Sequence, residues 1–149
     1  MIRRRIHTRV GWALSCMSIA TLMTACAISA GQRHQLAVSS QTVASALFAV
    51  QDAETVLYSS GKLTPAQHQQ FNQELVTALT LGRSFNAEVR AWQPGQPAPG
   101  VALRLKASLL KLSTELMATW KAEDRAAVQL TITLAYDAVV AVLLLRGGG

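Results

Sequence analysis

The segment from Ser59 to Gln67 restricts the fold most, because it ends one helix and begins the next within a few residues. Gly61 can adopt the left-handed backbone conformation that commonly terminates a helix. Thr64 is followed by proline, which suits the first helical position, and three residues later by Gln67, which completes the pattern of a capping box. Two helices joined so tightly must be antiparallel neighbours.

Apolar residues on both sides of this turn recur every three, four or seven residues, which places them on one face of a helix. We predict a first helix from Leu36 to Ser59 and a second from Pro65 to Trp92. The apolar face of the first consists of Leu36, Val43, Leu47, Val50 and Leu57. That of the second consists of Phe71, Leu75, Ala78, Gly82, Phe85, Val89 and Trp92. Glycine costs about 1 kcal/mol relative to alanine inside a helix, so we expect a neighbouring helix to approach closely at Gly82.

Three polar residues of this hairpin are candidates for a site. Glu54 interrupts the apolar face of the first helix, whereas Asp52 lies off it, and we interpret both as a solvated edge. His68 lies one turn after Pro65, beside glutamines, with no other metal-ligating residue at ligand spacing on its turn. We therefore expect His68 to be a surface residue.

The proline- and glycine-rich stretch 94–100 cannot be helical, and it separates the first hairpin from a third helix at Val101 to Trp120. One face of this helix carries Leu105, Leu109, Leu112, Leu116 and Trp120. Beside that face lie Leu103, Leu110 and Met117, a broad apolar stripe that we expect to contact two neighbours. Its basic outer surface, formed by Arg104, Lys106 and Lys111, is interpreted as a solvated face; the alternative is a site for lipid headgroups or an acidic partner.

The last helix starts near Ala122 and continues through 126–145 as nearly uninterrupted apolar sequence. About 20 residues suffice to cross a bilayer, but Asp137 near the centre would cost about 2.5–3.5 kcal/mol there. We favour a bundle helix packed on several sides over a membrane span, and helix over a local strand at 128–134. Asp137 is expected to be structural and, if buried, to pair with an arginine, for which Arg83, Arg90 and Arg104 are the candidates.

These elements predict an all-α fold, a four-helix up-down bundle built from two helical hairpins. Abundant alanine and leucine with only 5% aromatic residues favours helix over sheet. We place the bundle domain at 36–146, after a signal peptide at 1–25 and a non-helical tether at 26–35, and before a flexible tail at 147–149.

The N-terminal segment has the order of a secretory signal. Four arginines within the first nine residues precede an apolar run from Val10 to Met23, and the first acidic residue is Asp52. The run of about 14 residues spans roughly 21 Å as a helix, which is shorter than the roughly 30 Å hydrocarbon core of a bilayer. It suits an export signal better than a permanent span.

Residues Leu22, Met23, Thr24, Ala25 and Cys26 end this run. They resemble the lipobox of bacterial lipoproteins, with Met23 where the family prefers Leu, Val or Ile. The resemblance implies cleavage before Cys26, diacylglycerol on its sulfur, further fatty acylation such as palmitate, and a protein anchored on the periplasmic or extracellular face. The alternatives are ordinary cleavage after a small-residue A-x-A site at Ala25 to Ala27, and an uncleaved anchor.

From Cys26 onward the chain contains ten basic and eight acidic residues, a net charge of +2, so we expect no nucleic-acid partner. Cys26 is the only cysteine of that part, which excludes a disulfide or a cysteine metal site there. The sequence also lacks a Glu-x-x-His pair on each of two helices, a Cys-x-x-Cys-His haem motif, a nucleophile elbow and a phosphate-binding glycine loop.

We therefore expect no enzymatic activity, no cofactor and no metal. The favoured function is a non-enzymatic interaction or structural module of the bacterial cell envelope, held to the membrane by the lipid on Cys26 and binding another protein. One alternative is a small integral membrane protein that spans through 126–145, such as an assembly or lysis component. The other is a helical bundle that binds a cofactor or acts as an enzyme.

Overall fold

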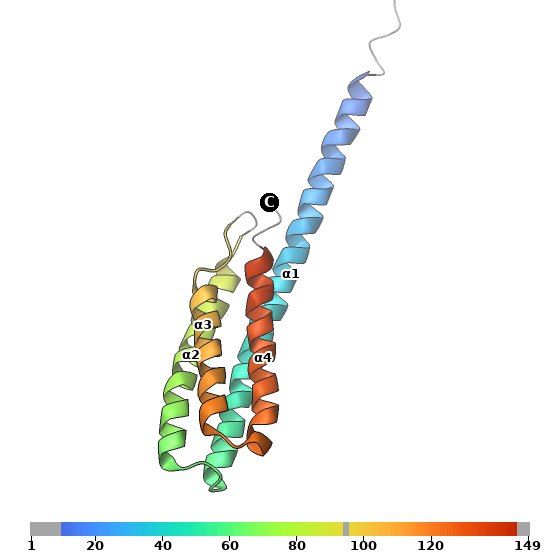
Figure 1. The fold of residues 1–149 in the computed structure, drawn as a ribbon. Coiled ribbons are helices and arrows are strands. Elements are labelled where there is room, and N and C mark those ends of the chain that lie inside the picture. The colour runs from blue at the N-terminus through green and yellow to red at the C-terminus, as the bar shows by residue number, and fades with distance from the viewer. Residues whose placement is uncertain (1–9, 94–95, 146–149) are drawn as a thin grey trace, which may run out of the picture.

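A computed structural model describes the backbone of residues 10–93 and 96–145, and the side chains of residues 31–93 and 96–145. The described chain forms four helices and no strand, which confirms the all-α four-helix prediction (Figure 1). The helices are α1 (Val10–Ser59), α2 (Pro65–Ala91), α3 (Val101–Thr119) and α4 (Ala122–Leu144). Residues 128–134 are helical, so the strand alternative is wrong.

The four helices pack as an up-down-up-down bundle. Each helix contacts the next one along the chain, and α1 also packs against α4, which closes the bundle (Figure 1). The N-terminal part of α1 extends beyond the bundle at the end where α2 and α4 finish and α3 starts. We call this the proximal end, and the opposite end, with the α1–α2 and α3–α4 turns, the distal end.

The end of α1 follows from the glycine at position 61, which has the positive φ of 73° that a side chain would disfavour. The N–H of Gly61 donates to the carbonyl of Tyr58 at 3.0 Å, and the N–H of Lys62 donates to that of Leu57 at 2.9 Å. This pair of bonds is a Schellman motif, which satisfies the last carbonyls of the helix.

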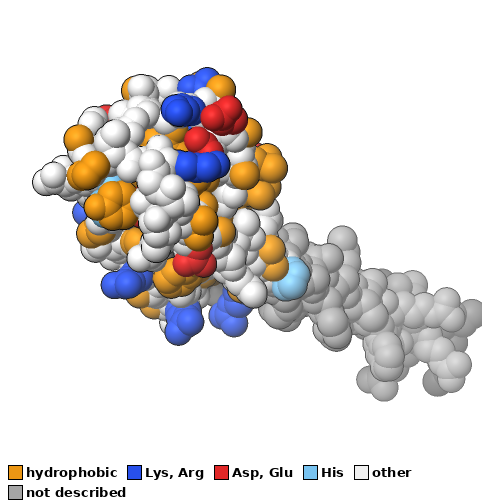
Figure 2. All heavy atoms as spheres, turned by 90° about the horizontal axis from the view of Figure 1, so that it is seen from below, with side chains coloured by type: hydrophobic (Ala, Val, Ile, Leu, Met, Phe, Trp, Pro, Cys, Tyr) orange, Lys and Arg blue, Asp and Glu red, His pale blue; other side chains and the backbone are white. Residues whose placement is uncertain are grey.

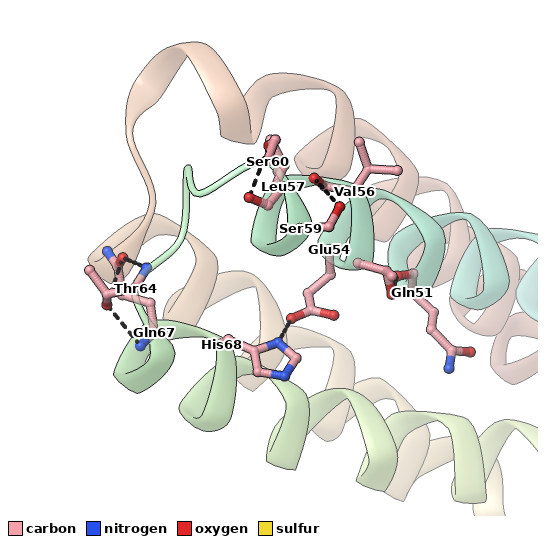
Figure 3. A network of polar contacts seen from close by, with 10 residues as sticks. Gln51, Glu54, Val56, Leu57, Ser59, Ser60, Thr64, Gln67 and His68 are labelled. Atoms are coloured by element: carbon pink, nitrogen blue, oxygen red, sulfur yellow. Dashed lines mark hydrogen bonds and ion pairs between the residues drawn. The ribbon is translucent and has the colours of Figure 1, made fainter.

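The start of α2 is the predicted capping box. The Thr64 hydroxyl accepts from the N–H of Gln67 at 3.3 Å, while the N–H of Thr64 donates to the Gln67 side chain at 2.9 Å (Figure 3). The Gln67 amide also donates to the carbonyl of Thr119, where α3 ends. The local cap therefore also ties the two distal turns of the bundle together.

The core runs the length of the bundle and confirms most of the predicted faces. All five residues of the predicted α3 face are buried, as are Leu36, Val43, Leu47 and Val50 of α1. The ends of the faces are less enclosed, because Leu57, Val89 and Trp92 are only partly buried. Gly82 is buried against α1, and a Cβ at this position would lie 2.7 Å from a methyl carbon of Leu47, which confirms the predicted close approach.

The predicted boundaries hold within one residue for α2, α3 and the end of α4, but α1 is longer than predicted. Residues 26–35, which we expected to form a non-helical tether, continue the helix without a break. Extending an existing helix is far easier than nucleating one, and the segment contains no proline and only one glycine, Gly31. The predicted tail at 147–149 lies outside the described residues, as does the N-terminal part of the signal peptide.

Candidate functional site

The exposed apolar residues of α3 form a regular row along the helix. Leu103, Leu110 and Met117 are spaced seven residues apart and all three are exposed. As predicted, α3 contacts two neighbouring helices, α2 and α4. The buried core of α3 nevertheless lies on the adjacent face, and these three side chains are not part of it. A row with heptad spacing is the pattern by which one helix packs against another.

The outer face of α4 is also apolar. As predicted for a bundle helix, α4 packs against more than one neighbour, namely α1 and α3. Its buried residues nevertheless occupy one face only, and they are Val128, Ile132, Ala135, Val139 and Val142. Leu130, Leu134 and Leu144 are 63%, 52% and 72% exposed. By length and composition Ala122–Leu144 could cross a membrane, and 28% of its most apolar stretch is buried in the bundle. The helix therefore carries much more apolar surface than the core uses.

A shallow groove of about 510 Å³ runs between α1 and α4 beside this face. Its walls are apolar or neutral polar and carry no charged side chain. They are formed by Val38, Gln41, Thr42, Ser45, Ala46, Thr131 and Leu134. The groove and the exposed leucines of α4, together with the α3 row, make up what we call the apolar surface.

Asp137 lies on the exposed side of α4. It therefore needs no buried arginine partner, and the ion pairs found among the described residues do not include it. Its neighbour Tyr136 is partly buried and lies under the ammonium group of Lys106 from α3, 5.6 Å from the ring centroid. The contact is a cation–π interaction and joins α3 to α4 near the proximal end.

Glu54 and His68 form a polar pair inside the α1–α2 hairpin, and both predictions for them need correction. Glu54 is 2% exposed instead of solvated. Its carboxylate faces Nδ1 of His68, whose side chain is 29% exposed rather than on the open surface (Figure 3). The imidazole stacks on Tyr58, with ring centroids 3.9 Å apart and planes 10° from parallel. A buried carboxylate is stable only with such a partner.

The sequence contained one signal for this pair. Glu54 lies four residues after Val50 and three before Leu57, which puts it on the apolar face itself. A charge at such a position is either a break in the face or a buried, paired group. The identity of the partner depends on the register of the hairpin, which places position 68 opposite position 54.

The basic residues of α3 have different environments. Lys111 bonds to the Glu74 carboxylate of α2 at 2.6 Å, and this contact raises the pKa of Lys111 above its ordinary value of 10.5. Lys62 and Asp124 pair at 2.7 Å across the distal end, and the carboxylate likewise raises the pKa of Lys62. Arg104 is exposed and is in none of the ion pairs among the described residues.

The candidate lipid acceptor, Cys26, lies in the helical part of α1 for which the structure gives no side-chain positions, so lipidation stays a prediction. Within the described residues no group of three or more His, Cys, Asp or Glu side chains is placed to hold a metal ion. Comparison of this chain with protein-family models, curated proteins and solved structures finds no match.

Proposed function

We propose that this chain is a lipid-anchored protein of the bacterial cell envelope, and that its bundle is a non-enzymatic module that binds another protein through the apolar surface. The observation that carries the proposal is the division of apolar residues in α3 and α4. One face of each helix completes the core, while leucines on the outer side remain exposed. Exposed apolar patches of this kind are characteristic of interaction sites.

The anchor part of the proposal rests on the sequence around Cys26. A short apolar run that ends in a lipobox-like segment implies diacylglycerol on the cysteine and attachment at the periplasmic or extracellular face of a membrane. Two or more acyl chains are needed for stable attachment, which lipoprotein processing supplies. The bundle would then be presented to other proteins of the envelope.

The row on α3 indicates the form of the partner. Leu103, Leu110 and Met117 repeat at the interval that matches one side of a second helix. An amphipathic helix of another protein, lying along α3 with its apolar face inward, would cover all three side chains. The Lys111–Glu74 pair lies toward α2, so it would border this contact and not be buried by it.

Mass spectrometry of the N-terminal peptide, from protein extracted from bacterial membranes, tests the anchor. A chain that begins at Cys26 with diacylglycerol and acyl mass supports the proposal. An unlipidated chain that begins at Ile28 or Gly31 would instead make the protein a secreted domain, and an intact Met1 would favour a membrane-spanning protein.

Site-specific photo-crosslinking in cells tests the apolar surface. A photoreactive residue at Leu110 or Leu134 should give one discrete adduct of defined mass with a second protein. The same residue at Gln73 or Thr77, which are polar positions of α2 away from the apolar surface, should not. Equal labelling at all four positions would contradict a specific partner on this surface.

The second candidate is an integral membrane protein that spans the membrane through α4. The length, composition and limited burial of Ala122–Leu144 support this candidate. It would require α4 to leave α1 and α3, exposing the core. Deletion of residues 1–25 separates the two candidates. A monodisperse helical protein without detergent excludes the spanning protein, whereas aggregation that only detergent reverses would exclude the lipid-anchored bundle.

A further inference from the structure

Charge is distributed unevenly along the bundle. The proximal half contains five basic and two acidic described residues: Arg33, Arg83, Arg90, Arg104 and Lys106 against Glu88 and Asp137. Among the described residues, the distal half contains four basic and six acidic ones. Figure 2 looks at the distal end, and at the upper edge of this view basic and acidic side chains touch one another. The three ion pairs among the described residues are all distal.

A groove lies at the basic end. It has a volume of about 800 Å³ and separates α1 from the last turns of α2. Arg33 of α1 and Arg90 of α2 both line it, while Leu36, Val89 and Trp92 supply apolar wall. The groove thus combines two positive charges with an apolar surface and an indole ring.

Two neutral polar groups of the groove are already occupied. The Ser40 hydroxyl donates to the side-chain oxygen of Asn86 at 2.9 Å, which joins α1 to α2 across the groove. The indole N–H of Trp92 donates to the carbonyl of Pro97 at 3.1 Å. The two guanidinium groups are the charged donors that the groove offers to a ligand, and no carboxylate lines it, so the ligand that it suits is an anion.

We propose that this groove binds the phosphate headgroup of an anionic phospholipid in the membrane to which the chain is anchored. This proposal rests on the proposed function, because the lipid anchor on Cys26 is what places the groove next to a membrane. Guanidinium groups match phosphate oxygens with pairs of parallel hydrogen bonds. Tryptophan suits the boundary between headgroups and acyl chains, and the apolar wall can accept the glycerol and the first methylenes of the lipid.

The position of the anchor favours a lipid over an acidic protein as the occupant. Cys26 precedes Arg33 by seven residues of continuous helix, about 10 Å along the axis at 1.5 Å per residue. This separation is about one Debye length at physiological ionic strength, so the anionic surface would attract the proximal arginines. A headgroup held so near has a high effective concentration, which a protein in solution lacks.

Tryptophan quenching in vesicles tests the proposal with the full chain. Of the three tryptophans, Trp92 lines the groove and Trp120 is buried at the distal end. A Trp12→Phe chain, purified from bacterial membranes, is reconstituted in phosphatidylcholine vesicles that contain phosphatidylglycerol. The substitution prevents any unprocessed chain from adding fluorescence. Bromine is placed on the acyl chains of either phosphatidylglycerol or phosphatidylcholine, at the same density in both preparations. A second chain that also carries Trp92→Phe measures how much of the fluorescence and its quenching comes from Trp120.

Brominated phosphatidylglycerol should quench Trp92 more strongly than brominated phosphatidylcholine, and high salt should remove the difference. Each arginine near an anionic surface contributes roughly fivefold to binding, so Arg33→Gln with Arg90→Gln should lower the apparent affinity for phosphatidylglycerol by roughly 25-fold. Lys62→Gln with Lys121→Gln removes the same charge from the distal end and should leave the quenching unchanged.

Equal quenching by the two brominated lipids, or a preference that survives the double arginine substitution, overturns the lipid site. Loss of the preference in the distal control as well would show attraction by net charge alone and also overturns it. The mass of the N-terminal peptide is read from the same preparation. A lipidated chain without the preference refutes only the groove proposal, whereas a preference in an unlipidated chain refutes only the proposed anchor.

Discussion

Replacement of His68 by phenylalanine should destabilise the bundle far more than a change at a surface histidine. The phenyl ring can keep the stacking on Tyr58, but it offers no polar atom to the carboxylate of Glu54. Removing the partner of a buried carboxylate leaves that group uncompensated, which typically costs about 3–5 kcal/mol. Because the His68 side chain is 29% exposed, water can replace part of the lost contact, and we expect about 3 kcal/mol.

A double-mutant cycle isolates the pair. Glu54→Met removes the buried charge with little change of volume and leaves His68 partly hydrated, so we expect a cost of about 1 kcal/mol or less. The double variant has an apolar contact in place of the pair, which is often neutral for stability. It should therefore be about as stable as the parent protein, which gives a coupling of about 3 kcal/mol or more between positions 54 and 68.

The assay is urea unfolding of chain 26–149, which includes every described buried residue, followed by far-UV circular dichroism. With a slope of about 2 kcal/mol per molar urea, His68→Phe should lower the midpoint by roughly 1.5 M. His34→Phe is the control, because His34 is exposed, and should change stability by no more than about 0.5 kcal/mol. A His68→Phe cost as small as that of the control would refute the buried pair.

Three further outcomes follow from the packing and charges. Gly82→Ala gains about 1 kcal/mol of helix propensity but forces a buried leucine aside at a cost of about 1–3 kcal/mol, so the melting temperature should not rise. Leu109→Ala should cost about 2–5 kcal/mol in urea unfolding, whereas the exposed Leu110→Ala should cost less than about 0.5 kcal/mol; equal costs would contradict the position of the core. Because carboxylates raise the pKa of Lys62 and Lys111, their pairs stabilise the fold below pH 10.5 and lose this effect as pH rises through the folded-state pKa. Lys62→Gln with Lys111→Gln should flatten that part of the stability profile, and an unchanged alkaline slope would show that the pairs contribute nothing.

The hairpin was predictable because the interactions that form it are local. Gly61 needs only its own backbone conformation, and Thr64 and Gln67 contact each other within one turn. The close approach at Gly82 was predictable for a similar reason, since a glycine inside an apolar face costs stability that only packing can offset. Such features depend on a few neighbouring residues, and the sequence places them directly.

The outer side of α4 was not predictable in the same way. When nearly every position of a helix is apolar, composition cannot say which face meets the core, and Leu130 and Leu134 look like Val128 and Ile132. The environment of Glu54 was missed because its partner comes from another helix. Both errors concern which side chains face one another across helices, and this depends on helix rotation and register.

The packing of α1 against α4 joins the first and last parts of the bundle. The three helix–turn–helix contacts are close in sequence and can form quickly, whereas this one must wait until the last helix has been made. Until then the buried face of α1, from Leu36 to Val50, has one open side. A chain that emerges from a ribosome or a translocation pore with its N-terminus first would expose this apolar face of α1 until α4 has also emerged. A chaperone could bind the exposed face during that time.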